Sequence, residues 1–264
     1  HVFSTIGSHG SLTVEQALMN SCNPYMIHLA LEMGNSRFAY YQSLFGFGKI
    51  TGIDLPGETT GIVYGDHMTT IDAACNSFGQ TINVNMMQMM AAYCSIINGG
   101  MLYQPHIVKR IESANGEVVK EYKANLVRQT ITASTSKLLR RYLKNTVESG
   151  TAKKAGVTGY SVAGKTGTAQ KGDRKDNKWI ISFIGHAPAE NPKFAIYVVI
   201  DEPYGTTGTS GSSADVLTLT HNILEKLLPY MNVYKDASDE YEDTSSSPDE
   251  LTVDGIPAGT ASSN

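Results

Sequence analysis

A single lysine, Lys165, lies in a run of small and hydroxyl-bearing residues that reads VAGKTGTAQ. Its ammonium group and the neighbouring hydroxyls of Thr166 and Thr168 could bind an anion together. The glycines on either side of the lysine carry no side chain, so a ligand could lie flat against the backbone there. The run therefore predicts a binding edge for a negatively charged group.

One interpretation of this run is a phosphate-binding loop. Residues Gly159–Thr166 match the G-x-x-x-x-G-K-[ST] pattern, and the apolar stretch Phe194–Asp201 ends in an acid that could bind magnesium. Such a loop needs a helix that begins at its Lys-Thr, so that backbone amides and the helix dipole face the phosphate. The residues before the lysine favour a strand instead, and the charged turn 171–178 comes soon after it. A nucleotidase is kept as an alternative.

The second interpretation is the K-T-G motif of serine acyl-transferases, Lys165-Thr166-Gly167. The run would be the first of three strands, followed by Trp179–Ala187 and Phe194–Asp201. Consecutive strands joined by short turns pair antiparallel. The lysine would then lie on one strand of a three-stranded antiparallel sheet.

A second polar cluster, Ser21-Cys22-Asn23, has the pattern S-x-N and stands immediately before Pro24. Apolar residues at helical spacing from Val14 to Met33 predict one helix or two around it. Proline disfavours helix at the residue before it, so we expect a break at the cluster. An exposed polar triplet at a helix break is well placed for chemistry.

Several other elements are needed to position these two clusters. We expect helices at 36–45, 84–98, 136–148 and 214–228, and a β-hairpin at 103–123 with its turn at Asn115-Gly116. The methionine-rich helix 84–98 is apolar nearly all round, which predicts that it is buried. The last helix should face the sheet with Val216, Leu219, Ile223 and Leu227. Together these elements predict an α/β (α+β) fold, an antiparallel sheet flanked by helices with an all-helical subregion.

With S-x-N and K-T-G in this order, the chain resembles the transpeptidase domain of class B penicillin-binding proteins over roughly residues 5 to 230. The phrases that carry the resemblance are GSHGSLTVEQALMNSCN, FGFGKITGIDLPGE, SFGQTINVNMMQMMAAYCSIINGG, ESGTAKKAG, VAGKTGTAQ and SFIGHAPAENPKFAIYVVIDEP. The resemblance implies the penicillin-binding-protein and serine β-lactamase fold, incomplete here at the N-terminus. It also implies a D,D-transpeptidase that crosslinks peptidoglycan stem peptides through an acyl-enzyme and is a target of β-lactams.

The family's nucleophile motif, S-x-x-K, would lie upstream of His1. The one such string in the sequence, Ser134-Thr135-Ser136-Lys137, follows S-x-N and stands at the start of an expected amphipathic helix, where hydroxyl side chains act as caps. We interpret it as a cap. A chain with no other nucleophile is not expected to acylate by itself.

The resemblance also assigns roles to individual residues. Ser21 belongs to a proton relay, Asn23 holds the substrate amide and the motif lysine, and Lys165 supplies positive charge. Thr166, Gly167 and Thr168 bind the substrate, with the two threonine hydroxyls on its carboxylate and the Thr168 amide as one oxyanion donor.

Charge and composition divide the chain into two parts. Residues 236–264 hold eight acids and no Lys or Arg, so the remainder has 21 basic against 17 acidic residues although the whole chain carries a net charge of −4. The remainder is too weakly basic for a nucleic-acid interface. We expect a partial transpeptidase domain at 1–234 and a disordered tail or linker at 235–264, because the tail has too few apolar groups to offset chain entropy.

Neither a disulfide framework nor a cofactor is expected. Cys22, Cys75 and Cys94 have spacings that favour buried free thiols, and a zinc site formed by His1, His9 and Cys22 with upstream residues is only an alternative. No signal peptide or long apolar run precedes residue 10, so a membrane anchor is expected upstream, with the domain on the extracytoplasmic face of a bacterial cell membrane.

The expected ligands are D-Ala-D-Ala stem peptides and β-lactams, and the expected partners are membrane proteins of cell-wall synthesis. A different class of function also remains open, a non-catalytic module that binds partners in the division or sporulation machinery. A carboxypeptidase is not excluded either.

Overall fold

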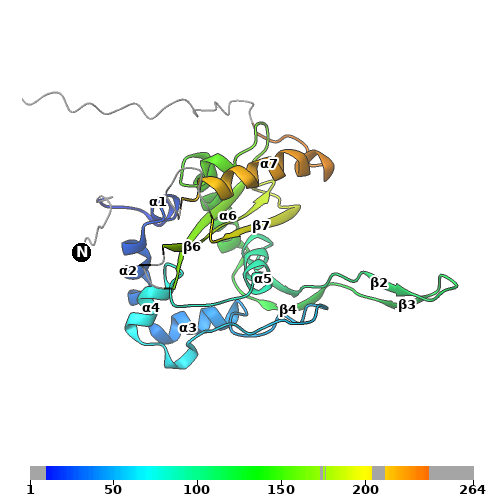
Figure 1. Cartoon of the computed structure of the whole chain (residues 1–264), viewed down its shortest axis with the longest axis horizontal. Helices are drawn as coiled ribbons and strands as arrows, with labels where there is room; N and C mark the ends of the chain where they lie inside the picture. Colours follow the sequence, from blue (N-terminus) through cyan, green and yellow to red (C-terminus); the bar gives the residue numbers. More distant parts are fainter. Residues whose placement is uncertain (1–9, 173–174, 176, 204–211, 238–264) are drawn as a thin grey trace, which may run out of the picture.

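A computed structural model describes residues 10–172, 175, 177–203 and 212–237 (Figure 1). The helices are α1 (Val14–Met19), α2 (Asn23–Met33), α3 (Asn35–Leu44), α4 (Thr70–Asn76), α5 (Met86–Ile97), α6 (Ala133–Glu148) and α7 (Ala214–Tyr230), with 3-10 turns η1 (Gly65–His67) and η2 (Lys153–Ala155). The strands are β1 (Met101–Gln104), β2 (Arg110–Glu112), β3 (Val118–Glu121), β4 (Asn125–Gln129), β5 (Ala163–Lys171), β6 (Lys178–Ala187) and β7 (Phe194–Asp201).

The central sheet has the order β5-β6-β7 and is antiparallel throughout, as the sequence predicts. Lys165 pairs with Ile184 on β6, and Phe183 pairs with both Thr166 and Val198. Within the described residues β5 is an edge strand, so the K-T-G motif lies on the border of the sheet. The predicted binding edge is therefore a real edge.

Helices cover both faces of this sheet. On one face Ile181 and Phe183 of β6 are fully buried against α7, together with partly buried residues of β7. On the other face Ile184 of β6 packs in a second cluster with residues of α5 and α6 such as Tyr93 and Leu143. The two faces alternate along β6 because successive side chains of a strand point to opposite sides.

The buried face of α7 differs from the prediction. Val216 is buried as expected, but Leu219 is 41% exposed and the other buried positions are Leu217, Thr220, Leu224 and Leu228. Thr220 can lie in the core because its hydroxyl donates to the carbonyl of Val216 at 2.7 Å. A prediction from apolar residues alone does not include a threonine, so the predicted buried face of α7 is rotated from the observed one.

The helical subregion is confirmed by α1 to α4, which lie together at one side of the sheet (Figure 1). Its small buried cluster consists of Ala39 of α3, Ala73 of α4 and Met68, which lies between η1 and α4. The break predicted at the S-x-N cluster separates α1 from α2, and Pro24 occupies the first turn of α2. Proline is compatible with this position because the first-turn amides of a helix have no partner within it.

The predicted hairpin is correct at its centre and wrong at its ends. Strands β2 and β3 pair with each other and project from the body of the molecule (Figure 1). Gly116 takes the left-handed conformation at φ +83° in their turn. Tyr103, however, belongs to β1, which pairs with β4. The strand β4 was not predicted, because its pairing depends on a partner more than twenty residues earlier in the chain.

Two predictions about burial need correction. The methionines of α5 are exposed or half-buried, with Met86 51% exposed, whereas Gln88, Ala92, Tyr93, Ser95 and Ile97 are buried. The helix therefore has one buried face. The cysteines are free thiols as predicted, but only Cys22 is buried, since Cys75 and Cys94 are half-buried.

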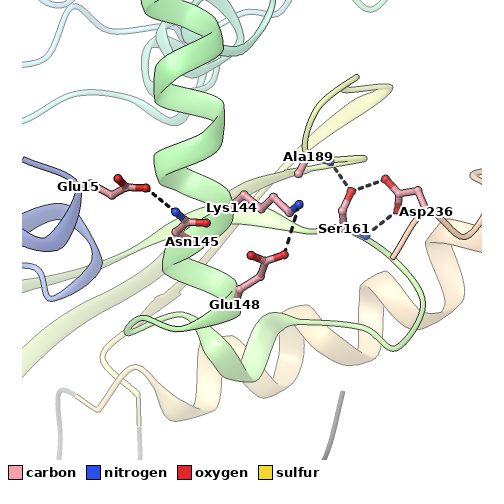
Figure 2. Close-up of polar contacts among 7 residues, drawn as sticks. All are labelled: Glu15, Lys144, Asn145, Glu148, Ser161, Ala189 and Asp236. Atoms are coloured by element: carbon pink, nitrogen blue, oxygen red, sulfur yellow. Dashed lines mark hydrogen bonds and ion pairs between the residues drawn. The ribbon is translucent and has the colours of Figure 1, made fainter. Parts of the chain in front are cut away.

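Chain segments after α7 return to the domain before the described residues end. The Asp236 carboxylate accepts a hydrogen bond from the Ser161 amide at 2.7 Å and another from the Ser161 hydroxyl (Figure 2). The amides of Asp236 and Ala237 both donate to the carbonyl of Gly159. Contacts with the domain thus continue a few residues past the expected boundary, and 238–264, expected to be disordered, lies outside the described residues.

Candidate active site

Ser21 closes α1 in a strained backbone conformation. The amide of Cys22 donates to the carbonyl of Ala17 at 2.9 Å and the amide of Ser21 donates to that of Leu18 at 3.2 Å, which is the Schellman pattern of a helix C-terminus. The residue in the left-handed position of this motif is usually glycine, but here it is Ser21 at φ +50°. A serine at this position presents a hydroxyl where glycine would be favoured for stability.

The Ser21 hydroxyl accepts a hydrogen bond from the ammonium of Lys165, although the two residues are 144 positions apart. The same ammonium donates to the carbonyl of Thr166 at 3.1 Å. Burial lowers the pKa of Lys165 from its usual value to about 8, because the charged form loses solvation. About a tenth of such lysines would be neutral at pH 7, so Lys165 can act both as a cation and as a proton acceptor.

Helix α6 contacts both α1, which leads to Ser21, and strand β5, which carries Lys165. At the side of α1, the Asn145 amide donates to a carboxylate oxygen of Glu15 (Figure 2). At the side of the sheet, the fully buried hydroxyl of Thr146 contacts the carbonyl oxygen of Gly164. Neighbouring residues of one rigid helix thus set the distance between Ser21 and Lys165.

The loop after α6 adds a contact that the sequence did not reveal. The Thr151 amide donates to the carbonyl of Met19 at 3.1 Å, and the Thr151 hydroxyl lies 3.4 Å from that of Thr166. Thr151 therefore belongs to the same cluster of hydroxyls as Ser21. Its phrase ESGTAKKAG was part of the family resemblance, which is the one signal that could have singled it out.

Gly164 has a structural reason that differs from the predicted one. A Cβ atom at Gly164 would lie 2.3 Å from the Phe183 ring, and one at Gly185 would lie 2.5 Å from the same ring. The ring of Phe183 thus lies over both glycines on the α7 side of the sheet. The prediction that Gly164 clears the backbone for a ligand is wrong, because the protein's own core occupies that space.

The remaining predicted site residues lie along the same edge or beside it. Thr166 and Gly167 are half-buried and Thr168 is exposed. Asn23 is the first residue of α2 and is exposed, and the hydrogen bonds of Lys165 within the described chain go to Ser21 and Thr166 and not to Asn23. Ser21 and Lys165 are thus brought together, whereas Asn23, two residues after Ser21 in the chain, makes no hydrogen bond to Lys165.

A family model described as the penicillin binding protein transpeptidase domain matches residues 4–225. The chain belongs to this family. Stage V sporulation protein D of Bacillus subtilis is 40% identical over 232 residues, which are 86% of this chain and 36% of that protein. Peptidoglycan D,D-transpeptidase FtsI of Escherichia coli K12 is 32% identical over 90% of this chain and 39% of its own length. The chain thus spans little more than a third of these relatives.

Solved structures agree with the family. Penicillin binding protein 3 of Mycobacterium tuberculosis in complex with ampicillin superposes with a TM-score of 0.79 at 30% identity, covering 89% of this chain and 55% of that one. The transpeptidase domain of Burkholderia pseudomallei penicillin-binding protein 3 gives 0.76 at 26% identity, covering 88% and 68%. The predicted family and fold of this transpeptidase domain are confirmed.

Two alternatives for the motifs fail on the geometry of the transpeptidase domain. Lys165 and Thr166 lie inside β5, and no helix begins there, so the phosphate-loop interpretation is wrong. The N-cap of α6 is Thr132 and Ser134 lies inside the first turn, so the interpretation of the Ser134–Lys137 string as the cap is wrong by two residues. Ser134 is twelve residues before Thr146, or about 18 Å along the helix, so it lies far from the K-T-G strand.

Metal ligands do not assemble in the part of the chain that the structure describes. No three His, Cys, Asp or Glu side chains come together there as a ligand set. Cys22 is buried at the N-cap of α2, while His1 and His9 of the alternative zinc site lie outside the described residues.

Proposed function

We propose that this chain forms the S-x-N and K-T-G walls of a serine D,D-transpeptidase active site that crosslinks peptidoglycan. The hydrogen bond between Lys165 and Ser21 carries the proposal, because it joins two motifs that only a shared site would bring together. The nucleophilic serine comes from an S-x-x-K segment upstream of His1.

Ser21 and Lys165 form the proton relay of this site. The Ser21 oxygen accepts from the Lys165 ammonium, so its own proton is free to be donated to the departing amine of the substrate. Lys165 then returns a proton to Ser21, which its pKa of about 8 favours near neutral pH. The nucleophile attacks the penultimate D-Ala carbonyl and releases the terminal D-Ala, while its own proton enters the relay and replaces the one that Lys165 gave up. An amine of a neighbouring stem then resolves the acyl-enzyme and returns a proton to the nucleophile.

Strand β5 binds the substrate along its free edge. The extended peptide pairs with the backbone from Thr166 to Thr168, as a strand added to a sheet. The hydroxyls of Thr166 and Thr168 hold the terminal carboxylate near the charge of Lys165, and the Thr168 amide is one donor to the oxyanion. Asn23, exposed beside Ser21, holds the substrate amide.

β-Lactams bind at the same place, because their carboxylate and strained amide reproduce the D-Ala-D-Ala terminus. The related protein of Mycobacterium tuberculosis was solved with ampicillin and with aztreonam. None of the described helices has the length and apolar character needed to cross a bilayer. We place the domain on the extracytoplasmic face, anchored by an upstream segment and in contact with membrane proteins of wall synthesis.

The test is covalent labelling by a fluorescent penicillin of the protein that carries this chain together with its S-x-x-K segment. We expect labelling of the wild type and a loss of at least about a hundredfold in labelling rate for Lys165→Ala, the size of effect seen when one stabilising donor is removed. Lys171→Ala is the matched control, because Lys171 lies on the same strand but is paired with Asp201 and Glu202.

The control should label at nearly the wild-type rate. Absence of labelling in the wild type, under conditions that label a known penicillin-binding protein, would show that the chain is a non-catalytic module. Equal labelling of Lys165→Ala and wild type would remove the role proposed for Lys165.

A further inference from the structure

A cavity of about 520 Å³ lies away from the site described above, where the C-terminal end of α5 and the N-terminal half of α6 meet the turn between β6 and β7. Its size is within the range of pockets that hold small organic molecules. Ile97, Pro192 and Phe194 give it an apolar wall, and Arg140 contributes a guanidinium group. Arg140 stands six residues before Thr146 on α6, so the cavity lies at least about 9 Å along the helix from the β5 contact.

Arg140 has donor capacity that the described protein does not use. One terminal nitrogen donates to the carbonyl of Ile97 at 2.8 Å and to the Ser136 hydroxyl at 3.1 Å. Its Nε is buried and has no partner, and no ion pair of Arg140 with a carboxylate is found among the described residues. The second terminal nitrogen of this half-buried side chain also has no partner among the described residues and is not buried, so it is the donor that an acceptor in the cavity would bind.

The other charges around the cavity leave Arg140 as its main cation. Glu190 lines the cavity but is exposed, so solvent screens its carboxylate. The Lys193 ammonium is directed to the carbonyl of Asn232 at 3.4 Å and to the ring of Tyr234. Ala133, the first residue of the sixteen-residue helix α6, also lines the cavity, seven residues before Arg140.

We propose that this cavity is a second ligand site, which binds a small monocarboxylate with an aromatic or branched apolar body. The carboxylate accepts from Arg140 in the middle of α6, and the apolar body packs against Ile97, Pro192 and Phe194. The cavity offers one cation beside an apolar wall, so a ligand with one anionic group and an apolar body would match it. The site is independent of the transpeptidase assignment.

The test uses 4-(trifluoromethyl)benzoate as the probe and 4-(trifluoromethyl)benzamide as its uncharged match, both followed by ¹⁹F NMR line broadening on the whole chain. We expect the benzoate to bind about tenfold more tightly than the benzamide, which is the effect of one charge-assisted hydrogen bond. Arg140→Gln should remove this tenfold difference, whereas Glu190→Gln should change benzoate binding little because solvent screens the Glu190 carboxylate.

Two further variants keep the test decisive. Ala133→Leu fills the cavity from an exposed helix position without removing a hydrogen bond, and it should weaken both probes. Lys165→Ala should leave benzoate binding unchanged, which separates this cavity from the K-T-G edge. Equal affinity of the two probes, or a loss of benzoate binding in Lys165→Ala with none in Arg140→Gln, would overturn the proposal.

Discussion

Replacing Ser21 with alanine and with glycine separates the strain of this residue from the work of its hydroxyl. Both substitutions remove the acceptor of the Lys165 ammonium, a hydrogen bond to a charged group that contributes about 1.5–3 kcal/mol when buried and less at this half-buried position. They differ in the backbone. At φ +50° a Cβ atom costs about 1–2 kcal/mol, and glycine is free of this cost.

The two variants should therefore differ in stability by a defined amount. Glycine loses about 0.5–1 kcal/mol more chain entropy on folding, which offsets part of the relief of strain. We expect Ser21→Gly to be about 0.5–1 kcal/mol more stable than Ser21→Ala by urea unfolding of the 264-residue chain. Penicillin labelling of the protein that contains the S-x-x-K segment should fall equally in both, because both lack the hydroxyl.

Ser36 provides the matched comparison, since it is exposed and lies in the first turn of α3 with right-handed helical geometry. There the order should reverse, with alanine more stable than glycine by up to about 1 kcal/mol. The reasoning is refuted if Ser21→Ala is as stable as Ser21→Gly, or if Ser21→Gly labels faster than Ser21→Ala.

Three further predictions concern the parts that support the site. Burial lowers the pKa of His186 from 6.5 to about 4, so between these pH values the unfolded chain binds a proton that the native chain does not. The free energy of unfolding should therefore fall by about 3 kcal/mol between pH 6.5 and pH 4. Urea unfolding of His186→Gln should depend less on pH, and an unchanged pH dependence would mean that the histidine is charged in the folded protein. Gly164→Ala should destabilise the chain by about 1–3 kcal/mol, because the new Cβ atom would contact the Phe183 ring. Adding Phe183→Leu should partly restore the stability that a thermal melt measures, and no restoration would mean that the ring is not the obstacle. Asp236→Ala should lower the free energy of unfolding in urea by about 1–2 kcal/mol, because two hydrogen bonds from Ser161, just before β5, are lost. A decrease no larger than that of Asp66→Ala, at an exposed position, would contradict this.

Patterns within short segments were sufficient for much of the fold. The three strand-like stretches between 162 and 201 predicted an antiparallel sheet, and Pro24 predicted the break between α1 and α2. Both signals are local, because strand alternation and the restriction imposed by proline act over a few residues. The location of K-T-G on a strand followed from the same evidence and disfavoured a phosphate loop, which the position of Lys165 inside β5 then excluded.

Other features depended on residues far away in the chain. Strand β4 forms because β1 is its partner, and Thr220 is buried because the carbonyl of Val216 satisfies its hydroxyl. The role of Gly164 could not be predicted, since the Phe183 ring that requires it comes from a neighbouring strand. In each case the deciding contact lies outside the window in which composition or periodicity is informative.

The sequence by itself determined the family, the order of S-x-N and K-T-G, and the type of most elements that carry them. Only the tertiary structure decided that Ser21 meets Lys165, that Ser21 is held in a left-handed conformation, and that burial lowers the pKa of Lys165. The physical reason is that helix and strand preferences act over a few neighbouring residues, whereas distance and desolvation between positions 144 apart arise from the packing of α6 between them.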